Sequence, residues 1–335
     1  MTSSPPGTPE KLPVNLRHKR SDAHLHHWRP TKIKVDNVHD ILSQYDTLLV
    51  DCDGVLWSKN QLSRLPKIKE ALQKLRDANK RLIFVSNNSL YSRHDYKEKI
   101  AQKVGYDVKL SDMFAIDYAI AVYLTKIAEI SGTVYVIGWP GLADELKLMG
   151  LDPIGIGSDP DPVPLKANDL LSFHLHQDVK AVVVGFDSYF CYNKLFKAAC
   201  YLKNPECEFV ASSVETSLAI NKNLVAPLEG TFVAALTAAT KRKPVVVGKP
   251  NKFLFDCVKS MNPTVTQGRT LMIGDTLETD VVFAKNTGID SLLVLTGSCS
   301  GLDLERLVLK DDARLKASIL PDYVMHSVAE FDAVL

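Results

Sequence analysis

The 335-residue sequence predicts an α/β protein built on a parallel sheet, with a second α/β unit inserted into it. Three observations lead to this prediction. Short apolar runs alternate with segments of helical periodicity, as in repeated strand–helix–strand units. Polar or charged residues follow several of these runs, at the strand ends where open α/β sheets bind their ligands. Near Ile130 the alternation starts afresh, and near Arg242 the first pattern resumes.

The first part of the chain begins with a short amphipathic helix over Val35–Tyr45 and a buried strand over Thr47–Val50. A helix is predicted over Pro66–Ala78, because its apolar residues recur on one face with charged residues opposite. The alternation then continues with a strand over Arg81–Val85, a helix over Arg93–Val104, and a helix from a cap at Ser111 and Asp112 through Leu124.

The inserted unit has its own strands and helices and no acidic pair at a strand end. We expect strands at Thr133–Ile137, Lys180–Val184 and Glu208–Ala211, helices at Leu142–Met149 and Tyr192–Lys203, and a loop at Ser158–Pro164. After the insert, strands at Pro244–Val247, Thr270–Ile273 and Ser291–Leu295 are predicted to resume the first sheet. The expected division is a flexible N-terminal tail at 1–34, a discontinuous core at 35–130 and 243–335, and an inserted domain at 131–242.

Composition excludes some classes of protein. A formal net charge of +1 argues against a nucleic-acid binder that depends on overall charge. No run approaches the roughly 20 apolar residues of a membrane span. The six cysteines form no CxxC pair, so they indicate neither a zinc site nor a disulfide framework. We expect a cytoplasmic protein; the basic stretch Arg17–Arg20 leaves a mitochondrial address as the less favoured alternative.

The stretch LLVDCDGVLW places Asp51 and Asp53 at the end of the first buried strand. Two carboxylates this close repel each other unless a cation or a proton lies between them. The pair therefore predicts a metal site in which one carboxylate also takes part in the chemistry. Asp275 follows a later strand in the same way, and three oxygen ligands of this kind suit Mg²⁺.

Hydrogen-bond donors follow the neighbouring strands. Ser86, the amides of Asn87 and Asn88, and Lys249 together supply donors and one positive charge. Donors and a cation around a metal ion are what a phosphoryl group requires, because its charge rests on its outer oxygens. The sequence contains neither a Walker A loop nor a GxGxxG loop, so a loop that cradles a nucleotide is excluded.

In chain order, the segments DCDGVLW, SNNS, VGKP and IGDTLETD resemble the four motifs of the haloacid-dehalogenase (HAD) superfamily of phosphohydrolases. This resemblance implies a Rossmann-like core, and the insert lies where that superfamily carries an α/β cap of the C2 type. The segments VGFDSYF, YNKL, NPECEFVAS and VLTG resemble the eukaryotic branch of phosphoglycolate phosphatase, 4-nitrophenylphosphatase and pyridoxal phosphatase (chronophin).

The resemblance implies a role for each site residue. Asp51 would be the nucleophile that forms an aspartyl-phosphate, and Asp53 would be the general acid and base. The phosphoryl group would be bound by Ser86, Asn87, Asn88 and Lys249. Mg²⁺ would be held by Asp51, Asp53 and Asp275, with Asp280 orienting this shell from outside it.

Several positions depart from the pattern of the branch. Thr276 stands where the superfamily usually has Arg, which removes a cation near the site entrance. In the cap, Ser212–Glu215 replaces a Thr-Asn-x-Asp motif, and Leu228-Glu229-Gly230 replaces Gly-Thr-Gly. Leu218 stands where chronophin-like loops have His. These changes leave the core motifs intact, so we expect them to affect the choice of leaving group.

The function expected from this resemblance is Mg²⁺-dependent hydrolysis of small phosphorylated metabolites, with 2-phosphoglycolate as the best candidate substrate. Pyridoxal phosphate, phosphotyrosine and 4-nitrophenyl phosphate are the alternatives within this class. The alternative from another class is a catalytically silent binding protein that retains the HAD fold. Neither a nucleic acid nor a membrane is expected as a partner, and the resemblance allows a homodimer formed through the cap.

Overall fold

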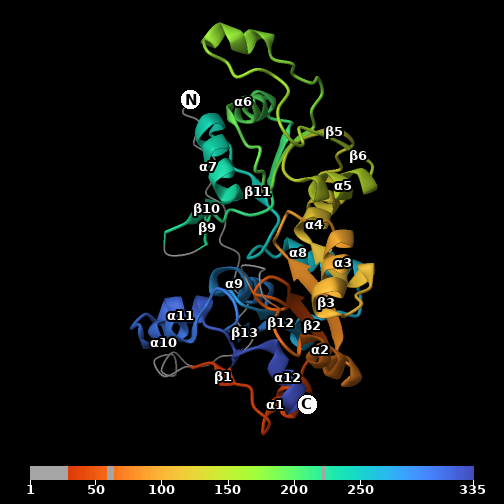
Figure 1. Cartoon of the computed structure of the whole chain (residues 1–335), viewed down its shortest axis with the longest axis vertical. Helices are drawn as coiled ribbons and strands as arrows, with labels where there is room; N and C mark the ends of the chain where they lie inside the picture. Colours follow the sequence, from red (N-terminus) through yellow and green to blue (C-terminus); the bar gives the residue numbers. More distant parts are fainter. Residues whose placement is uncertain (1–28, 59–63, 221–222) are drawn as a thin grey trace, which may run out of the picture.

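The computed structural model describes residues 29–58, 64–220 and 223–335, which form two lobes arranged end to end (Figure 1). One lobe, called the core lobe here, contains the chain before residue 131 and its C-terminal part. The other, called the cap lobe, contains the inserted unit. Each lobe is built on a parallel sheet, so the predicted α/β fold with an α/β insert is confirmed.

The core lobe contains a seven-stranded sheet in the order β1-β14-β13-β12-β2-β3-β4, in which every pairing is parallel. From β2 the chain proceeds outward through β3 and β4 on one side, and through β12, β13 and β14 on the other. The junction of β2 and β12 is therefore a topological switch point, where ligands bind in open α/β sheets. The strands are β1 (Thr31–Lys32), β2 (Thr47–Asp51), β3 (Arg81–Ser86), β4 (Met113–Ala115), β12 (Thr270–Gly274), β13 (Asp290–Val294) and β14 (Tyr323–Met325).

Helices cover both faces of this sheet, because successive residues of each strand point to opposite sides. Leu48 and Val50 of β2 belong to one buried apolar cluster, and Leu49 between them belongs to another. The first cluster includes residues of α1 (Val38–Leu42), α2 (Ile68–Asp77), α3 (Arg93–Val104) and α12 (Phe331–Val334). The second includes residues of α4 (Ile116–Val122), α8 (Phe253–Met261) and α9 (Val282–Thr287).

Shorter elements complete the core lobe. Helices α10 (Gly301–Leu309) and α11 (Ala313–Ile319) lie beside β13 and α9 (Figure 1). Single π-helical turns extend α4 at its end and precede α9, and short 3₁₀ turns connect other elements. The π turns are Tyr123–Ile127 and Leu277–Val281, and the 3₁₀ turns are Leu110–Asp112, Ala167–Ser172 (in the cap lobe), Gln267–Arg269 and Val328–Glu330.

The cap lobe contains a five-stranded parallel sheet in the order β11-β8-β7-β5-β6 and a separate two-stranded hairpin. The hairpin, β9–β10, lies on the side of the cap that faces the core lobe (Figure 1). The elements are β5 (Gly132–Ile137), α5 (Pro140–Leu148), β6 (Leu151–Ile154), β7 (Ala181–Val184), α6 (Tyr192–Tyr201), β8 (Glu208–Ala211), β9 (Ser217–Ala219), β10 (Val225–Pro227), α7 (Glu229–Thr240) and β11 (Val245–Val246).

Three local predictions differ from the structure. The helix expected from Ser111 begins only at Ile116, because Met113–Ala115 are buried and pair with β3 as strand β4. The strand expected at Pro244–Val247 is present as β11, but it joins the cap sheet beside β8 and not the core sheet. Ordered structure also starts before residue 35, since Thr31–Lys32 pairs with β14. The rest of the predicted tail, residues 1–28, lies outside the described residues.

In residues 29–58, 64–220 and 223–335, no helix is both long and apolar enough to cross a bilayer.

Candidate active site

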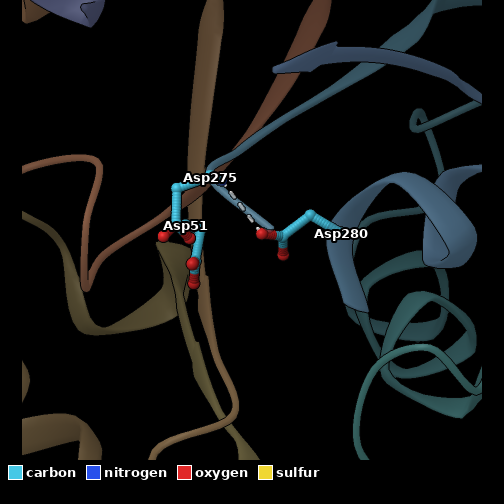
Figure 2. Close-up of side chains that lie close together, drawn as sticks. All are labelled: Asp51, Asp275 and Asp280. Carbon is cyan, nitrogen blue, oxygen red and sulfur yellow. Dashed lines mark hydrogen bonds between the residues drawn. The ribbon is translucent and has the colours of Figure 1, made fainter. Parts of the chain in front are cut away.

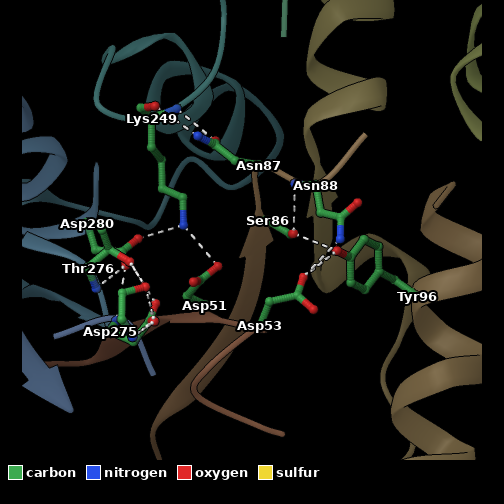
Figure 3. A network of polar contacts seen from close by, with 11 residues as sticks. Asp51, Asp53, Ser86, Asn87, Asn88, Tyr96, Lys249, Asp275, Thr276 and Asp280 are labelled. Atoms are coloured by element: carbon green, nitrogen blue, oxygen red, sulfur yellow. Dashed lines mark hydrogen bonds and ion pairs between the residues drawn. The ribbon is translucent and has the colours of Figure 1, made fainter. Parts of the chain in front are cut away.

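The carboxyl ends of the core strands converge on one pocket (Figure 3). Asp51 is the last residue of β2, Ser86 is the last residue of β3, and Asp275 directly follows β12. Lys249 reaches the pocket from the loop between β11 and α8. The pocket has a volume of about 280 Å³ and also contains Asp53. The structure thus brings together side chains that lie far apart in the sequence.

Lys249 connects two of the carboxylates. Its buried Nζ donates to Oδ1 of Asp51 at 2.9 Å and to Oδ1 of Asp280 at 2.7 Å. Burial by itself would lower the pKa of Lys249, but the charges of Asp280 and Asp51 outweigh burial and raise this pKa well above its ordinary value. Lys249 is therefore held as a permanent cation in the pocket.

The environment of Asp51 disfavours the ionised form of its carboxyl group. Burial raises the pKa of Asp51 well above that of an ordinary aspartate; the Lys249 charge opposes this rise, and the charges of Asp280 and Asp275 add to it. One ammonium group therefore does not compensate three buried carboxylates. A further cation at this position would stabilise the ionised form of Asp51.

Asp51, Asp275 and Asp280 each place a carboxylate oxygen within 4.8 Å of the others (Figure 2). A set of carboxylate oxygens fits a hard divalent cation such as Mg²⁺. Asp53 was predicted as a ligand; its carboxylate is not part of this cluster, whereas that of Asp280 is. The difference arises because β2 ends at Asp51, and the chain then turns through Gly54, which has a φ of +87°.

The carboxylate of Asp53 points toward α3 (Figure 3). Its Oδ1 accepts a hydrogen bond from Nε1 of Trp57 at 2.8 Å. Its Oδ2 accepts from the hydroxyl of Tyr96 at 3.0 Å and from Nδ2 of Asn88 at 3.3 Å. Nζ of Lys99 lies 3.8 Å from Oδ1. Four side chains thus fix the orientation of this carboxyl group.

Asp275 is held by the loop that follows β13. Its Oδ2 accepts from the amide of Ser298 at 2.6 Å and from the Ser298 hydroxyl at 2.8 Å, and its Oδ1 accepts from Thr276 Oγ1 at 3.1 Å. A Cβ atom at Gly54 or Gly297 would lie 2.4 or 2.0 Å from Oδ2 of Asp275, so only glycine fits at these two positions.

Asp280 has two functions in this network. Its Oδ1 accepts from Lys249, and its Oδ2 accepts from the amides of Asp275 and Thr276, both at 3.1 Å. Asp280 therefore positions the backbone that carries Asp275 and also contributes an oxygen to the acidic cluster. Thr276, which stands where an Arg was expected, contacts Asp275, and its Oγ1 lies 2.8 Å from Ser298 Oγ.

The side chains of the donors predicted at the end of β3 have different hydrogen-bond partners. The hydroxyl of Ser86 is buried, 2.7 Å from the Tyr96 hydroxyl, and accepts from the amide of Asn88 at 3.2 Å. The side chain of Asn87 forms two hydrogen bonds with the backbone of Lys249, both at 2.8 Å. The side chain of Asn87 therefore holds the Lys249 loop in place.

Sequence reasoning missed several residues of the site. Trp57, Tyr96 and Lys99 contact Asp53, and Ser298 contacts Asp275. Trp57 is the last residue of the motif DCDGVLW, and the sequence did not predict a contact between it and Asp53. Tyr96 and Lys99 lie inside α3, where nothing in the helical pattern distinguishes a residue that faces the site from one that faces the apolar core.

The cap lobe closes the pocket on its other side. Ser213, Glu215, Leu218, Leu228 and Glu229 line it together with the core residues. All five belong to the segment Ser212–Glu229, in which the sequence departs from its relatives. The residues expected to affect leaving-group choice therefore lie against the site.

Comparisons with known families agree with this geometry. The sequence pattern of the haloacid dehalogenase-like hydrolases matches residues 48–152, and a second pattern, described as HAD-hydrolase-like, matches residues 246–331. The two matches include Asp51, Asp53, Ser86 and Lys249 as well as the loop that carries Asp275.

Individual relatives are similar over most of their length. A glycerol-3-phosphate phosphatase of Rattus norvegicus is 34% identical over 310 residues, covering 90% of this chain and 94% of the relative. The chloroplastic phosphoglycolate phosphatase 1A of Arabidopsis thaliana is 35% identical over 301 residues, covering 89% and 79%. A solved glycerol phosphate phosphatase from Mycobacterium tuberculosis, in complex with magnesium, superposes with a TM-score of 0.66 at 26% identity, covering 87% and 77%.

Proposed function

Because this chain belongs to the haloacid dehalogenase-like hydrolases, we propose that it hydrolyses small phosphomonoesters through an aspartyl-phosphate on Asp51. The observation that carries the proposal is the position of Asp51. Its carboxylate lies at the switch point of the core sheet, contacts Lys249 and shares a pocket with Asp53 and Ser86. The rat and Arabidopsis relatives described above are both named as phosphatases, which supports the same class of reaction.

The proposed reaction has two steps. Asp51 attacks phosphorus, the bond between phosphorus and the alcohol oxygen breaks, and Asp53 gives its proton to the departing alcohol. Asp53 then takes a proton from a water molecule that attacks the aspartyl-phosphate, which releases inorganic phosphate and restores Asp51. The hydrogen bonds from Trp57, Tyr96 and Asn88 to Asp53 would hold its carboxyl group in one orientation for both proton transfers.

The phosphoryl oxygens would be bound by the Ser86 hydroxyl, by the amides of Asn87 and Asn88, and by Lys249. For Lys249 this means exchanging part of its contact with Asp51 for a contact with the substrate. Asp280 keeps the ammonium group in position during this exchange, since it contacts the same Nζ atom. These donors stabilise the negative charge on the outer oxygens during transfer.

The proposed cofactor is Mg²⁺. The carboxylate oxygens of Asp51, Asp275 and Asp280 suit this ion, and a relative has been solved with magnesium. When bound, Mg²⁺ would reduce the repulsion between the incoming phosphate and Asp51. Asp53 was expected among the ligands; with its carboxylate directed toward α3, we propose that Asp53 acts through proton transfer.

The core site by itself does not select a substrate, because a phosphoryl group is common to all the candidates. The sequence favoured 2-phosphoglycolate, and the Arabidopsis relative bears that name, whereas the rat relative is named for glycerol 3-phosphate. We propose that residues 131–242 act as the cap that makes this choice.

The proposal predicts that turnover depends on Asp51. Asp51→Asn removes the nucleophile and should lower kcat for 4-nitrophenyl phosphate on the order of 10³-fold or more. Asp144→Asn is the matched control, because Asp144 is exposed on α5, away from the pocket, and should retain wild-type turnover. Steady-state hydrolysis is followed by nitrophenolate absorbance during a titration with Mg²⁺, after treatment with a chelator.

Two results would contradict the proposal. Wild-type protein that remains inactive at saturating Mg²⁺ would favour the silent binding protein. Equal turnover by wild type and Asp51→Asn would show that another group is the nucleophile.

A further inference from the structure

The cap wall of the pocket contains two carboxyl groups, Glu215 and Glu229. The remaining cap side chains on this wall are the hydroxyl of Ser213 and apolar groups. Among the described residues that line the pocket, Lys249 is the one basic side chain, and it comes from the core lobe. Because the core wall binds the phosphoryl group, the cap wall faces the alcohol part of the ester.

The chain fixes these two acids beside each other. Glu229 is the first residue of α7 and is only 6% exposed. The amide of Gly230 donates to the carbonyl of Glu215 at 2.9 Å, and the amide of Leu228 donates to that of Thr216 at 3.0 Å. A Cβ atom on Gly230 would lie 2.3 Å from the carbonyl oxygen of Val214. The start of α7 and the loop that carries Glu215 are therefore in close backbone contact.

The electrostatics of this wall disfavour another anion. Burial raises the pKa of Glu229 to about 7, the nearby charge of Glu215 adds to this rise, and the hydroxyls of Ser213 and Ser212 oppose it. A substrate carboxylate at this wall would be repelled by Glu215 and by the ionised form of Glu229. It would also lack a cation, because Lys249 is already shared by Asp51 and Asp280.

A hydroxyl or ammonium group would find the opposite environment. Two carboxyl groups offer several acceptor oxygens, and an ammonium group would also gain from their charge. A wall lined with hydrogen-bond acceptors disfavours esters whose alcohol part offers no donor to it.

Resting on the phosphatase activity proposed above, we propose that Glu229 and Glu215 are specificity-determining residues. They select esters whose alcohol part carries hydroxyl or ammonium groups, and they exclude esters that carry a carboxylate. On this proposal 2-phosphoglycolate, the substrate favoured by the sequence, is a poor substrate of this chain.

The test compares three esters of matched size, each of which has two carbon atoms in its alcohol part. These are 2-phosphoglycolate, with a carboxylate, ethylene glycol monophosphate, with a hydroxyl, and phosphoethanolamine, with an ammonium group. For the wild type we expect kcat/KM for the hydroxyl and ammonium esters to exceed that for 2-phosphoglycolate by about 10-fold or more.

The double variant Glu215→Gln/Glu229→Gln keeps the size of both side chains and removes their charge. It should narrow the ratio of kcat/KM between 2-phosphoglycolate and the other two esters by about 10-fold. A circular-dichroism spectrum that matches the wild type reports correct folding of the variant. Glu206→Gln, at an exposed position in the turn after α6, is the matched control and should leave the wild-type ratios unchanged.

Each contrary result has a distinct meaning. A wild type that hydrolyses 2-phosphoglycolate as well as the other two esters, or better, would overturn this inference and leave the phosphatase proposal intact. Unchanged ratios in a double variant that still hydrolyses 4-nitrophenyl phosphate would do the same. Failure of the wild type to hydrolyse any of the four esters would overturn both proposals.

Discussion

At the scale of single residues, Lys249 joins two carboxylates that would otherwise repel each other. Asp51 and Asp280 come from different ends of the chain, and both contact its Nζ atom. The sequence placed Asp51 and Asp280 in the same predicted site, because Asp51 lies in the motif DCDGVLW and Asp280 ends the motif IGDTLETD. The orientation of the Asp53 carboxylate could not be predicted, because it depends on Trp57 and on Tyr96 of α3. No pattern of the sequence encodes how these side chains meet.

Glu229 gives a prediction at this scale. An ordinary glutamate has a pKa of 4.5, whereas in the folded protein the pKa of Glu229 is raised to about 7, chiefly by burial. Between these two values the folded state binds a proton that the unfolded state has lost, so stability falls as the pH rises from 4.5 to 7. A pKa difference of one corresponds to about 1.4 kcal/mol, so the loss is on the order of 3 kcal/mol.

Glu229→Gln should remove this loss. The free energy of unfolding of the variant should equal that of the wild type below about pH 4 and exceed it by about 3 kcal/mol at pH 8. Urea denaturation at several pH values measures the difference, and Glu206→Gln serves as the exposed control. A constant difference between Glu229→Gln and wild type across this pH range would contradict the assignment.

At the scale of secondary-structure elements, some predicted bounds match the structure and several elements were not predicted. Helix α3 has the predicted bounds, Arg93–Val104, and strand β8 has the predicted bounds, Glu208–Ala211. Helix α7 was missed because its sequence, EGTFVAALTAAT, is small or apolar almost throughout and shows no polar face. The β9–β10 hairpin was missed because each strand has only three residues.

Helix α7 also leads to a prediction about its first turn. In Gly230→Ala the new Cβ atom would lie 2.3 Å from the Val214 carbonyl oxygen and 2.5 Å from that of Glu215, both backbone atoms. The loop or the helix must shift, so we expect a loss of about 1–3 kcal/mol in the free energy of unfolding. The shift should also change the ratio of kcat/KM between charged and uncharged esters, because it moves Glu229.

Gly268→Ala is the matched control for this change. A Cβ atom at Gly268 meets nothing within 4 Å, so this variant should unfold within about 0.5 kcal/mol of the wild type. Urea denaturation of the two variants gives the comparison. Equal stabilities of Gly230→Ala and Gly268→Ala would show that the start of α7 is not as closely packed as the structure indicates.

At the scale of the whole molecule, the sequence predicted a core sheet interrupted by an α/β insert, and the structure confirms that architecture. The sequence could not predict to which sheet β11 belongs. This strand consists of only two valines after a connecting segment, and they do not indicate with which other strand they pair. In the structure, β11 pairs with β8. The chain segment that returns from the cap to Lys249 is thereby tied to the cap sheet, so the positions of Lys249 and of the cap wall depend on the same strands.

The two lobes are also joined by a buried ion pair. Arg93 of α3 donates to both carboxylate oxygens of Glu145 of α5, at 2.9–3.2 Å, and the Glu145 side chain is fully buried. The Arg93 guanidinium lies 3.5 Å from the ring centroid of Tyr118 in α4. A Cβ atom on Gly141 of α5 would lie 2.6 Å from the amide of Ser92. Cap helix α5 is thus packed directly against the core lobe.

Replacing only one partner of this ion pair should lower the free energy of unfolding. Arg93→Met would leave the Glu145 carboxylate buried without its partner, for which we expect a loss of about 3–5 kcal/mol in the free energy of unfolding. Lys97→Met is the matched control, because Lys97 lies on the same helix and pairs with Asp107 at 3.7 Å on the surface. Exposed pairs of this kind contribute about 0–1 kcal/mol.

The double variant Arg93→Met/Glu145→Met measures how much the contact between these two side chains contributes to stability. Replacing both partners with apolar side chains of similar length removes the buried charge, so the double variant should be more stable than the sum of the two single losses predicts. Urea denaturation of the four proteins completes the cycle. Strictly additive losses, or an Arg93→Met variant as stable as Lys97→Met, would mean that the position of the cap does not depend on this pair. The apolar contacts of α4 and α5 would then be sufficient to hold the cap wall against the pocket that contains Asp51 and Lys249.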